Sequence, residues 1–251
     1  MRTLAAALLC AFAGSAAFGL EAKNPNECMT VAAQAPPDFA LPHVSQAIRN
    51  KKLDIVVIGS ASSELTGPGG ANLGYPVRLE AALAKLLPGI AVKISAYAKV
   101  RDSAAEMAKK MIRILPETRP ALLVWQTGTA DAVRGIDADE FRTSLDQGVD
   151  RVEGAKADLI LMNMQYSPRT DVMLAQNAYA DAMRMIALQR EVVLFDRLSI
   201  MKRWNEGGVF DLYGTTRTTD MAERVHDCLG RLLANTVIAG AKMTLTDNKA
   251  R

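Results

Sequence analysis

The sequence contains few aromatic residues and few histidines. Phe, Trp and Tyr make up 5% of the 251 residues, there are 2 histidines, and the formal net charge is +3. A nucleic-acid-binding surface needs clustered Lys and Arg residues, commonly interleaved with aromatics. The sequence has no such cluster. Nucleic acid is therefore excluded as an expected partner.

Motifs for metals and nucleotide cofactors are missing as well. His43 and His226 lie far apart, and with so few cysteines they do not give the ligand spacing of a metal centre. The glycine-rich stretch at residues 67–70 lacks the lysine of a phosphate-binding loop and does not lead directly into a helix. We expect neither a metal nor a cofactor.

Long apolar runs are missing after the N-terminal segment. Arg2 precedes an apolar run over residues 4–12, and small residues dominate positions 14–19. This order is typical of a secretory signal peptide, and the apolar run is too short to span a bilayer. We interpret residues 1–19 as a signal peptide, cleaved after Ala17 or Gly19. The mature protein is expected to be periplasmic or secreted, with no stable membrane span.

Cysteine is scarce too. Cys10 falls within the predicted signal peptide, which leaves Cys28 and Cys228 in the mature chain. An even pair of cysteines in an oxidising compartment predicts one disulfide, here joining the N-terminal region to the last helix. Two unpaired cysteines are the alternative.

The mature chain is long enough for one domain with a full core. Prolines at positions 25, 36, 37 and 42 argue against regular structure before a short helix near residues 44–50. We therefore predict an N-terminal arm over residues 20–50, a single domain over residues 51–242 and a polar tail over residues 243–251.

Residues 53–58 give the clearest structural signal, because five of the six are apolar. Such a short, continuous run favours a strand buried on both faces of a parallel sheet. Further strands alternate with helices, which predicts a three-layer α/β sandwich with a parallel five-stranded sheet and a ligand site at the carboxyl ends of the strands. The other strands are expected at residues 90–96, 121–126, 159–164 and 192–195, and the helices at 77–87, 103–115, 138–153, 174–189 and 220–239.

Five sequence blocks then follow one another along the chain. They are Gly59-Ser60-Ala61-Ser62-Ser63, Tyr75-Pro76-Val77-Arg78-Leu79-Glu80, Trp125-Gln126-Thr127-Gly128-Thr129, Gln165-Tyr166-Ser167-Pro168 and Cys228-Leu229-Gly230-Arg231. In this order the chain resembles the SGNH/GDSL hydrolases, in particular an exported bacterial branch. The resemblance covers nearly the whole mature chain. It implies a flavodoxin-like fold of the kind found in esterases, lipases and carbohydrate acetylesterases.

Every catalytic position implied by this resemblance is substituted. The nucleophilic serine falls on Ala61, the oxyanion glycine on Ala98 and the oxyanion asparagine on Ala130. The catalytic histidine falls on Asp220 and its aspartate on Arg217. Loss of an oxyanion donor typically costs ~10²–10³ in rate, and loss of a serine nucleophile costs about 10⁶. A methyl group cannot attack an acyl carbon, so we predict that no residue is catalytic.

A relocated active site is the alternative. Ser60 or Ser62, beside the substituted position, would act as nucleophile and His226 as base. However, His226 is expected inside the last helix, more than one turn beyond the helix end that faces the strands. Hydrogen bonding within the turn is the simpler role for the serines, and packing is the simpler role for His226 and His43.

The residues after the first and third strands are expected to line a cleft. Among them, Asp131 and Arg134 are interpreted as a solvated pair that is able to contact a polar ligand. The full set is Gly59, Ser60, Ser62, Gly128, Thr129, Asp131 and Arg134.

Three functions fit these observations. The first is an exported, catalytically inactive binding or accessory protein, whose partner is an acylated glycan or another protein. The second is an active serine esterase, or carbohydrate acetyl hydrolase, with a relocated nucleophile. The third is a purely structural interaction protein that binds no ligand in its cleft.

Overall fold

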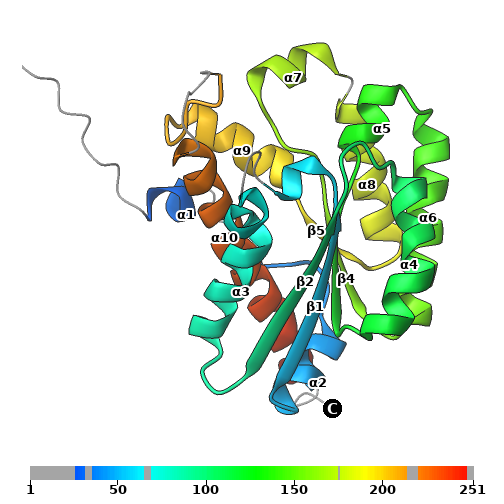
Figure 1. The fold of residues 1–251 in the computed structure, drawn as a ribbon, viewed down its shortest axis with the longest axis vertical. Coiled ribbons are helices and arrows are strands. Elements are labelled where there is room, and N and C mark those ends of the chain that lie inside the picture. The colour runs from blue at the N-terminus through cyan, green and yellow to red at the C-terminus, as the bar shows by residue number, and fades with distance from the viewer. Residues whose placement is uncertain (1–25, 32–35, 65–68, 175, 214–219, 248–251) are drawn as a thin grey trace, which may run out of the picture.

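The protein is built around one parallel β-sheet (Figure 1). The computed structural model describes residues 26–31, 36–64, 69–174, 176–213 and 220–247. Within these residues the strand order is β2-β1-β3-β4-β5 and every pair is parallel, which is the flavodoxin-like order. The predicted fold class is confirmed. The strands are β1 (Lys52–Gly59), β2 (Ala91–Ala98), β3 (Leu122–Gln126), β4 (Asp158–Met162) and β5 (Val193–Phe195).

Helices cover both faces of the sheet, as Figure 1 shows. On one face lie α2 (Pro42–Arg49), α3 (Tyr75–Leu86) and α10 (Asp220–Asp247). On the other lie α4 (Ala104–Thr118), α6 (Ala138–Gly154) and α8 (Gln176–Gln189). Shorter elements complete the fold: α1 (Glu27–Val31), the 3₁₀ turns η1 (Ala61–Ser63) and η2 (Gly70–Leu73), α5 (Thr129–Arg134), α7 (Pro168–Met173) and α9 (Arg197–Glu206).

The residue composition of each strand reflects how deeply the strand is buried. All residues of β3 and β4 are buried, in keeping with their continuous apolar runs. The edge strand β2 is only partly buried, and it continues to Ala98, two residues beyond the predicted end, because it pairs with β1 as far as Gly59. This register brings the ends of β1 and β2 together.

Several helix bounds differ from the prediction for local reasons. Pro116 lies inside α4 instead of after it. A proline donates no amide hydrogen and its ring crowds the carbonyl four residues earlier. Here the proline lies in the last turn of the helix, and the residue that carries this carbonyl, Ile112, is exposed. The helix predicted over residues 174–189 is confirmed as α8, which begins at Gln176. The short helix α7, which starts at a capping box formed by Ser167, precedes it and was not predicted. The predicted N-cap Asp137 of α6 is confirmed, since its carboxylate accepts from the amides of residues 139 and 140.

The predicted arm and tail are more regular than expected. Helix α1 lies within residues 20–50, where the prolines had argued against structure, and α10 continues to Asp247, into the predicted tail. The predicted signal peptide, residues 1–19, lies outside the described residues and stays a prediction. No described helix is long and apolar enough to cross a membrane.

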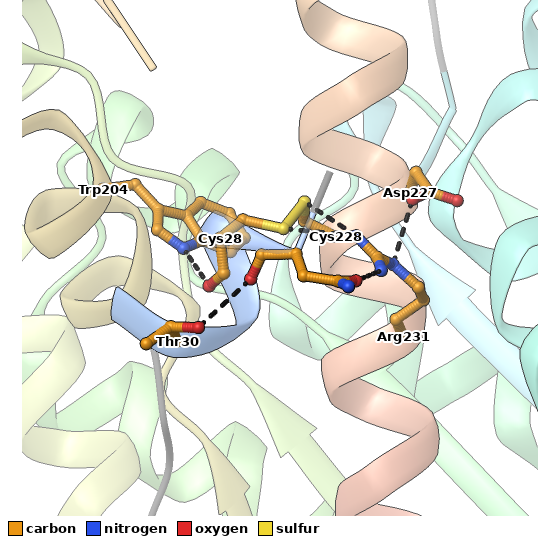
Figure 2. The surroundings of a disulfide bond; sticks show 7 residues. Cys28, Thr30, Trp204, Asp227, Cys228 and Arg231 are labelled. Atoms are coloured by element: carbon orange, nitrogen blue, oxygen red, sulfur yellow. Dashed lines mark hydrogen bonds and ion pairs between the residues drawn. A yellow bond between two sulfur atoms is a disulfide. The ribbon is translucent and has the colours of Figure 1, made fainter. Parts of the chain in front are cut away.

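A disulfide joins the N-terminal region to the last helix (Figure 2). Cys28 of α1 is bonded to Cys228 of α10, with 200 positions between them in the sequence. The Trp204 indole N–H donates to the Cys28 carbonyl at 2.8 Å, and the Arg231 guanidinium lies 3.4 and 3.6 Å from the two sulfur atoms. The predicted pairing is confirmed, and a disulfide is compatible with an extracellular location.

Asp158, at the start of β4, is a buried carboxylate at the amino end of the sheet. One of its oxygens accepts from the Val44 amide at 2.8 Å and so helps to fix the first turn of α2. Burial raises the pKa of Asp158 to about 6, although the backbone amides of Val44 and His43 partly oppose this rise.

A raised carboxyl pKa implies a stability that depends on pH. The folded state holds the Asp158 proton more tightly than the unfolded state, so stability is highest below the ordinary pKa and falls as the pH rises through about 6. Asp158→Asn keeps an acceptor for Val44 without a charge. We expect it to raise the free energy of unfolding at pH 7 by roughly 2–3 kcal/mol.

Urea unfolding of both proteins at pH 4, 5, 6 and 7 measures this difference. The gain should shrink towards pH 4. Asp181→Asn, at an exposed position, is the control and should not produce this pH dependence. A loss of stability at pH 7 in Asp158→Asn would contradict the prediction.

Candidate functional site

A cavity lies at the carboxyl ends of the strands, where α5 and α7 are also found (Figure 1). Its volume is about 370 Å³. It lies where β1 is flanked by β2 on one side and by β3 on the other, which is the switch point that binds ligands in open α/β sheets. The lining residues are Ser60, Ala61, Ser62, Val100, Arg101, Thr129, Ala130, Val133, Arg134 and Gln165.

A cluster of serines after β1 converges on one glutamine side chain. The Gln126 Oε1 atom accepts from the Ser60 amide at 3.1 Å, and the hydroxyls of Ser60, Ser62 and Ser63 lie 3.2, 3.1 and 3.0 Å from the same atom. The chain can turn this tightly because Gly59 has no side chain, since a Cβ there would lie 2.0 Å from the Ser63 oxygen. The serines are thus held by Gln126 and not by a histidine.

Arg197 is a buried cation directly behind this cluster. Its side chain is 1% exposed, and it comes from the first turn of α9, just after β5. One terminal nitrogen donates to the Ser62 hydroxyl at 3.1 Å and the other to the Gln165 side-chain oxygen at 3.3 Å. Burial lowers the pKa of Arg197 to about 10, which leaves the guanidinium charged at neutral pH.

His226 is buried and already bonded through one ring nitrogen. Its Nδ1 atom accepts from the Tyr75 amide at 2.8 Å, and its ring lies against the Tyr75 ring with 6.1 Å between centroids. Burial, followed by the charges of Arg197 and Arg78, lowers the pKa of His226 to about 3. Among the described residues, no serine hydroxyl is hydrogen-bonded to His226. A neutral ring of such low basicity is a poor general base.

A protein-family model described as the Non-GDSL lipase-like family matches residues 27–243. The chain belongs to this family. The match spans every described strand and all but the last residues of α10, and it agrees with the predicted SGNH/GDSL resemblance.

Solved structures of other proteins share the fold of this family member. A catalytic mutant of the acetylxylan esterase Axe2 from Geobacillus stearothermophilus is 16% identical, with a TM-score of 0.60 over 74% of this chain and 94% of that one. AlinE4, an SGNH-hydrolase family esterase, is 19% identical, with a TM-score of 0.52 over 73% and 96%. TesA is 19% identical, with a TM-score of 0.57 over 72% and 97%. With identities this low, the structural similarity shows a common fold and does not by itself show a common function. No curated protein matches the chain significantly.

The structure also places most of the residues that the sequence analysis aligned with the SGNH catalytic groups. Ala61 is exposed at the start of η1 and Ala130 is buried in α5, and both line the cavity. Ala98 ends β2 and pairs with Gly59. Asp220 is the exposed first residue of α10, and Arg217 lies outside the described residues.

The structure separates the predicted cleft residues into two groups. Ser60, Ser62, Thr129 and Arg134 line the cavity, whereas Gly59, Gly128 and Asp131 do not. Gly59 is covered by η1, and Gly128 packs against Met164.

Asp131 is not half of a solvated pair with Arg134. Its carboxylate is buried and accepts from the Ala104 amide at 3.0 and 3.2 Å, which fixes the start of α4. Burial raises the pKa of Asp131. Arg134 instead forms an ion pair with Glu106 at 2.8 Å.

Other site residues were missed by the sequence analysis. Gln126 is the one polar residue at the end of an apolar strand, and this signal was available in the sequence. Arg197 looked like an ordinary charged residue after β5, and only its burial distinguishes it. In the described part of the chain, no group of three His, Cys, Asp or Glu residues is placed to hold a metal ion.

Proposed function

We propose that this protein is an exported, catalytically inactive member of the Non-GDSL lipase-like family that binds a small ligand in the strand-end cavity. The signal-peptide pattern of residues 1–19 and the Cys28–Cys228 disulfide support export. The cavity at the switch point of the sheet supports a binding role.

The observation that carries the proposal is the separation of every hydroxyl at the site from a base. The sequence resemblance assigns the nucleophile position to Ala61, and the neighbouring serines bond to Gln126 and Arg197. His226 donates nothing to them and accepts from the Tyr75 amide. A serine without a base is not an effective nucleophile at neutral pH.

An acylated glycan is the ligand class suggested by the fold, because the similar structure of Axe2 is that of an acetylxylan esterase. A protein partner is the second candidate. Helix α7 has no buried residue, and its Val172 and Met173 are 89% and 79% exposed, which is apolar surface available for a partner.

A fluorophosphonate probe and p-nitrophenyl acetate test the absence of catalysis. We expect no labelling of the wild-type protein and no turnover above the buffer rate. The variant Ala61→Ser/Arg217→Asp/Asp220→His is the positive control, because it introduces the serine, aspartate and histidine of the SGNH triad at the aligned positions. It should be labelled by the probe. Stoichiometric labelling of wild type that disappears in Ser60→Ala or Ser62→Ala would show an active esterase instead.

A further inference from the structure

Several hydrogen-bonding groups at the strand-end site lack a full set of partners. Four donors from Ser60, Ser62 and Ser63 point at the single Gln126 Oε1 atom, and a carbonyl oxygen has only two lone pairs. The side-chain nitrogen of Gln126 and the hydroxyls of residues 127 and 129 are buried without a partner. Of these three residues, residue 129 lines the cavity, where its hydroxyl is able to donate to a ligand oxygen.

The site also has a buried positive charge that the described residues do not neutralise. Arg197 has no carboxylate partner among them, and its Nε atom is buried without a hydrogen bond. Tyr75, 6.0 Å away, supplies no charge, because burial raises its pKa to about 12. Burying an unpaired charge is costly unless an opposite charge compensates it.

The groups bonded to Arg197 connect it to the cavity. Ser62 and Gln165 both line the cavity, and both are only partly buried. Their contacts with the guanidinium, at 3.1 and 3.3 Å, are longer than typical charged hydrogen bonds. Arg197 itself does not line the cavity. A carboxylate in the cavity would therefore contact Ser62 and Gln165, and its charge would compensate the buried guanidinium at short range.

The remainder of the cavity wall is largely apolar. Ala61 and Ala130 present methyl groups, and Val100 and Val133 are 63% and 62% exposed beside them. Arg101 and Arg134 are also part of the lining. Glu106 is already paired with Arg134, so the balance of charge around the cavity is positive.

We propose that the cavity binds an aliphatic monocarboxylic acid, with its carboxylate at Ser60, Ser62 and Gln165 against the charge of Arg197. The alkyl chain lies on Ala61, Ala130 and the two valines. This assignment rests on the proposed non-catalytic function and specifies its ligand as a free acid in place of an ester. An ester brings no charge and leaves Arg197 uncompensated.

Calorimetric titration of the full mature chain with hexanoate and with hexanamide tests the proposal. The two ligands have the same alkyl chain and differ in charge. We expect saturable one-to-one binding of hexanoate and at least tenfold weaker binding of hexanamide. Equal affinity for the two ligands, or no binding of hexanoate, would overturn the proposal.

Two variants locate the site. Arg197→Met should weaken hexanoate binding at least tenfold and leave hexanamide unchanged, and its ligand-free melting temperature should not fall. Ala61→Leu changes an exposed position and fills the cavity, so it should weaken hexanoate binding at least tenfold even if Arg197→Met does not fold. Arg142→Met removes an exposed arginine of α6 and is the matched control. Undiminished binding in Ala61→Leu would refute the assignment.

The experiments distinguish a failure of the carboxylate assignment from a failure of the proposed function. If hexanoate does not bind but an acetylated xylo-oligosaccharide raises the melting temperature, the carboxylate assignment fails and the binding function stands. If p-nitrophenyl acetate is hydrolysed through Ser60 or Ser62, the non-catalytic function fails whatever the titration gives.

Discussion

Replacing both disulfide cysteines, as in Cys28→Ser/Cys228→Ser, is expected to lower the free energy of unfolding by roughly 5 kcal/mol. The bridge joins positions separated by 200 residues, and in the chain-entropy description the gain from a cross-link grows with the loop it closes. Residues around the bridge are also held in place, since Trp204 donates to the Cys28 carbonyl. The loss should therefore be a large fraction of the total free energy of unfolding of a domain.

Urea unfolding followed by tryptophan fluorescence measures this effect. Both tryptophans, Trp125 and Trp204, are fully buried and report on the core. A reducing agent should lower the stability of the wild-type protein to that of the double variant and leave the variant unchanged. A loss below about 1 kcal/mol would show that the bridge does not stabilise through the unfolded chain.

A side chain at Gly148 is expected to destabilise the protein by about 3 kcal/mol. Helix α6 packs on the sheet at this residue, and a Cβ atom there would lie 2.2 and 2.3 Å from two ring carbons of Trp125. That ring is fully buried, and its N–H lies 3.3 Å from the Met107 sulfur. Since the ring cannot move into solvent, Gly148→Leu must shift the helix.

A double-mutant cycle makes this prediction specific. Trp125→Ala alone should cost ~3–5 kcal/mol through the cavity that it leaves. The combination Trp125→Ala/Gly148→Leu should cost less than the sum of the two, by about 1–3 kcal/mol, because the new side chain fills that cavity. Gly154→Leu is the matched control, since no atom lies within 4 Å of a Cβ at that position. Strict additivity would contradict the packing described above.

The strands were predictable because burial leaves a local record in the sequence. The apolar runs that became β1, β3, β4 and β5 were all recognised, and the alternation of strands with helices gave the three layers. Short elements were less visible. Helices α1, α5 and α9 were missed because each is anchored by contacts with distant residues, as the Cys28–Cys228 bond anchors α1.

The sequence predicted the place of the cavity, after the first and third strands, because Ser60, Ser62, Thr129 and Arg134 do line it. The assignment of Ala61, Ala98 and Ala130 to SGNH catalytic positions comes from the alignment of motifs and stays a prediction. The buried environment of Arg197 could not be predicted, because a basic residue after a strand has no distinguishing sequence pattern. Its Ser62 partner is 135 positions away in the sequence. His226 likewise shows its bond to Tyr75 only after α10 has packed on α3.

The sequence alone determined the layered fold and the pairing of two cysteines, because these depend on residue type and local spacing. The tertiary structure decided which polar groups lack partners. It buried the Arg197 cation and turned three serine hydroxyls onto one oxygen, since only the packing of distant segments sets the solvation and the partners of a side chain.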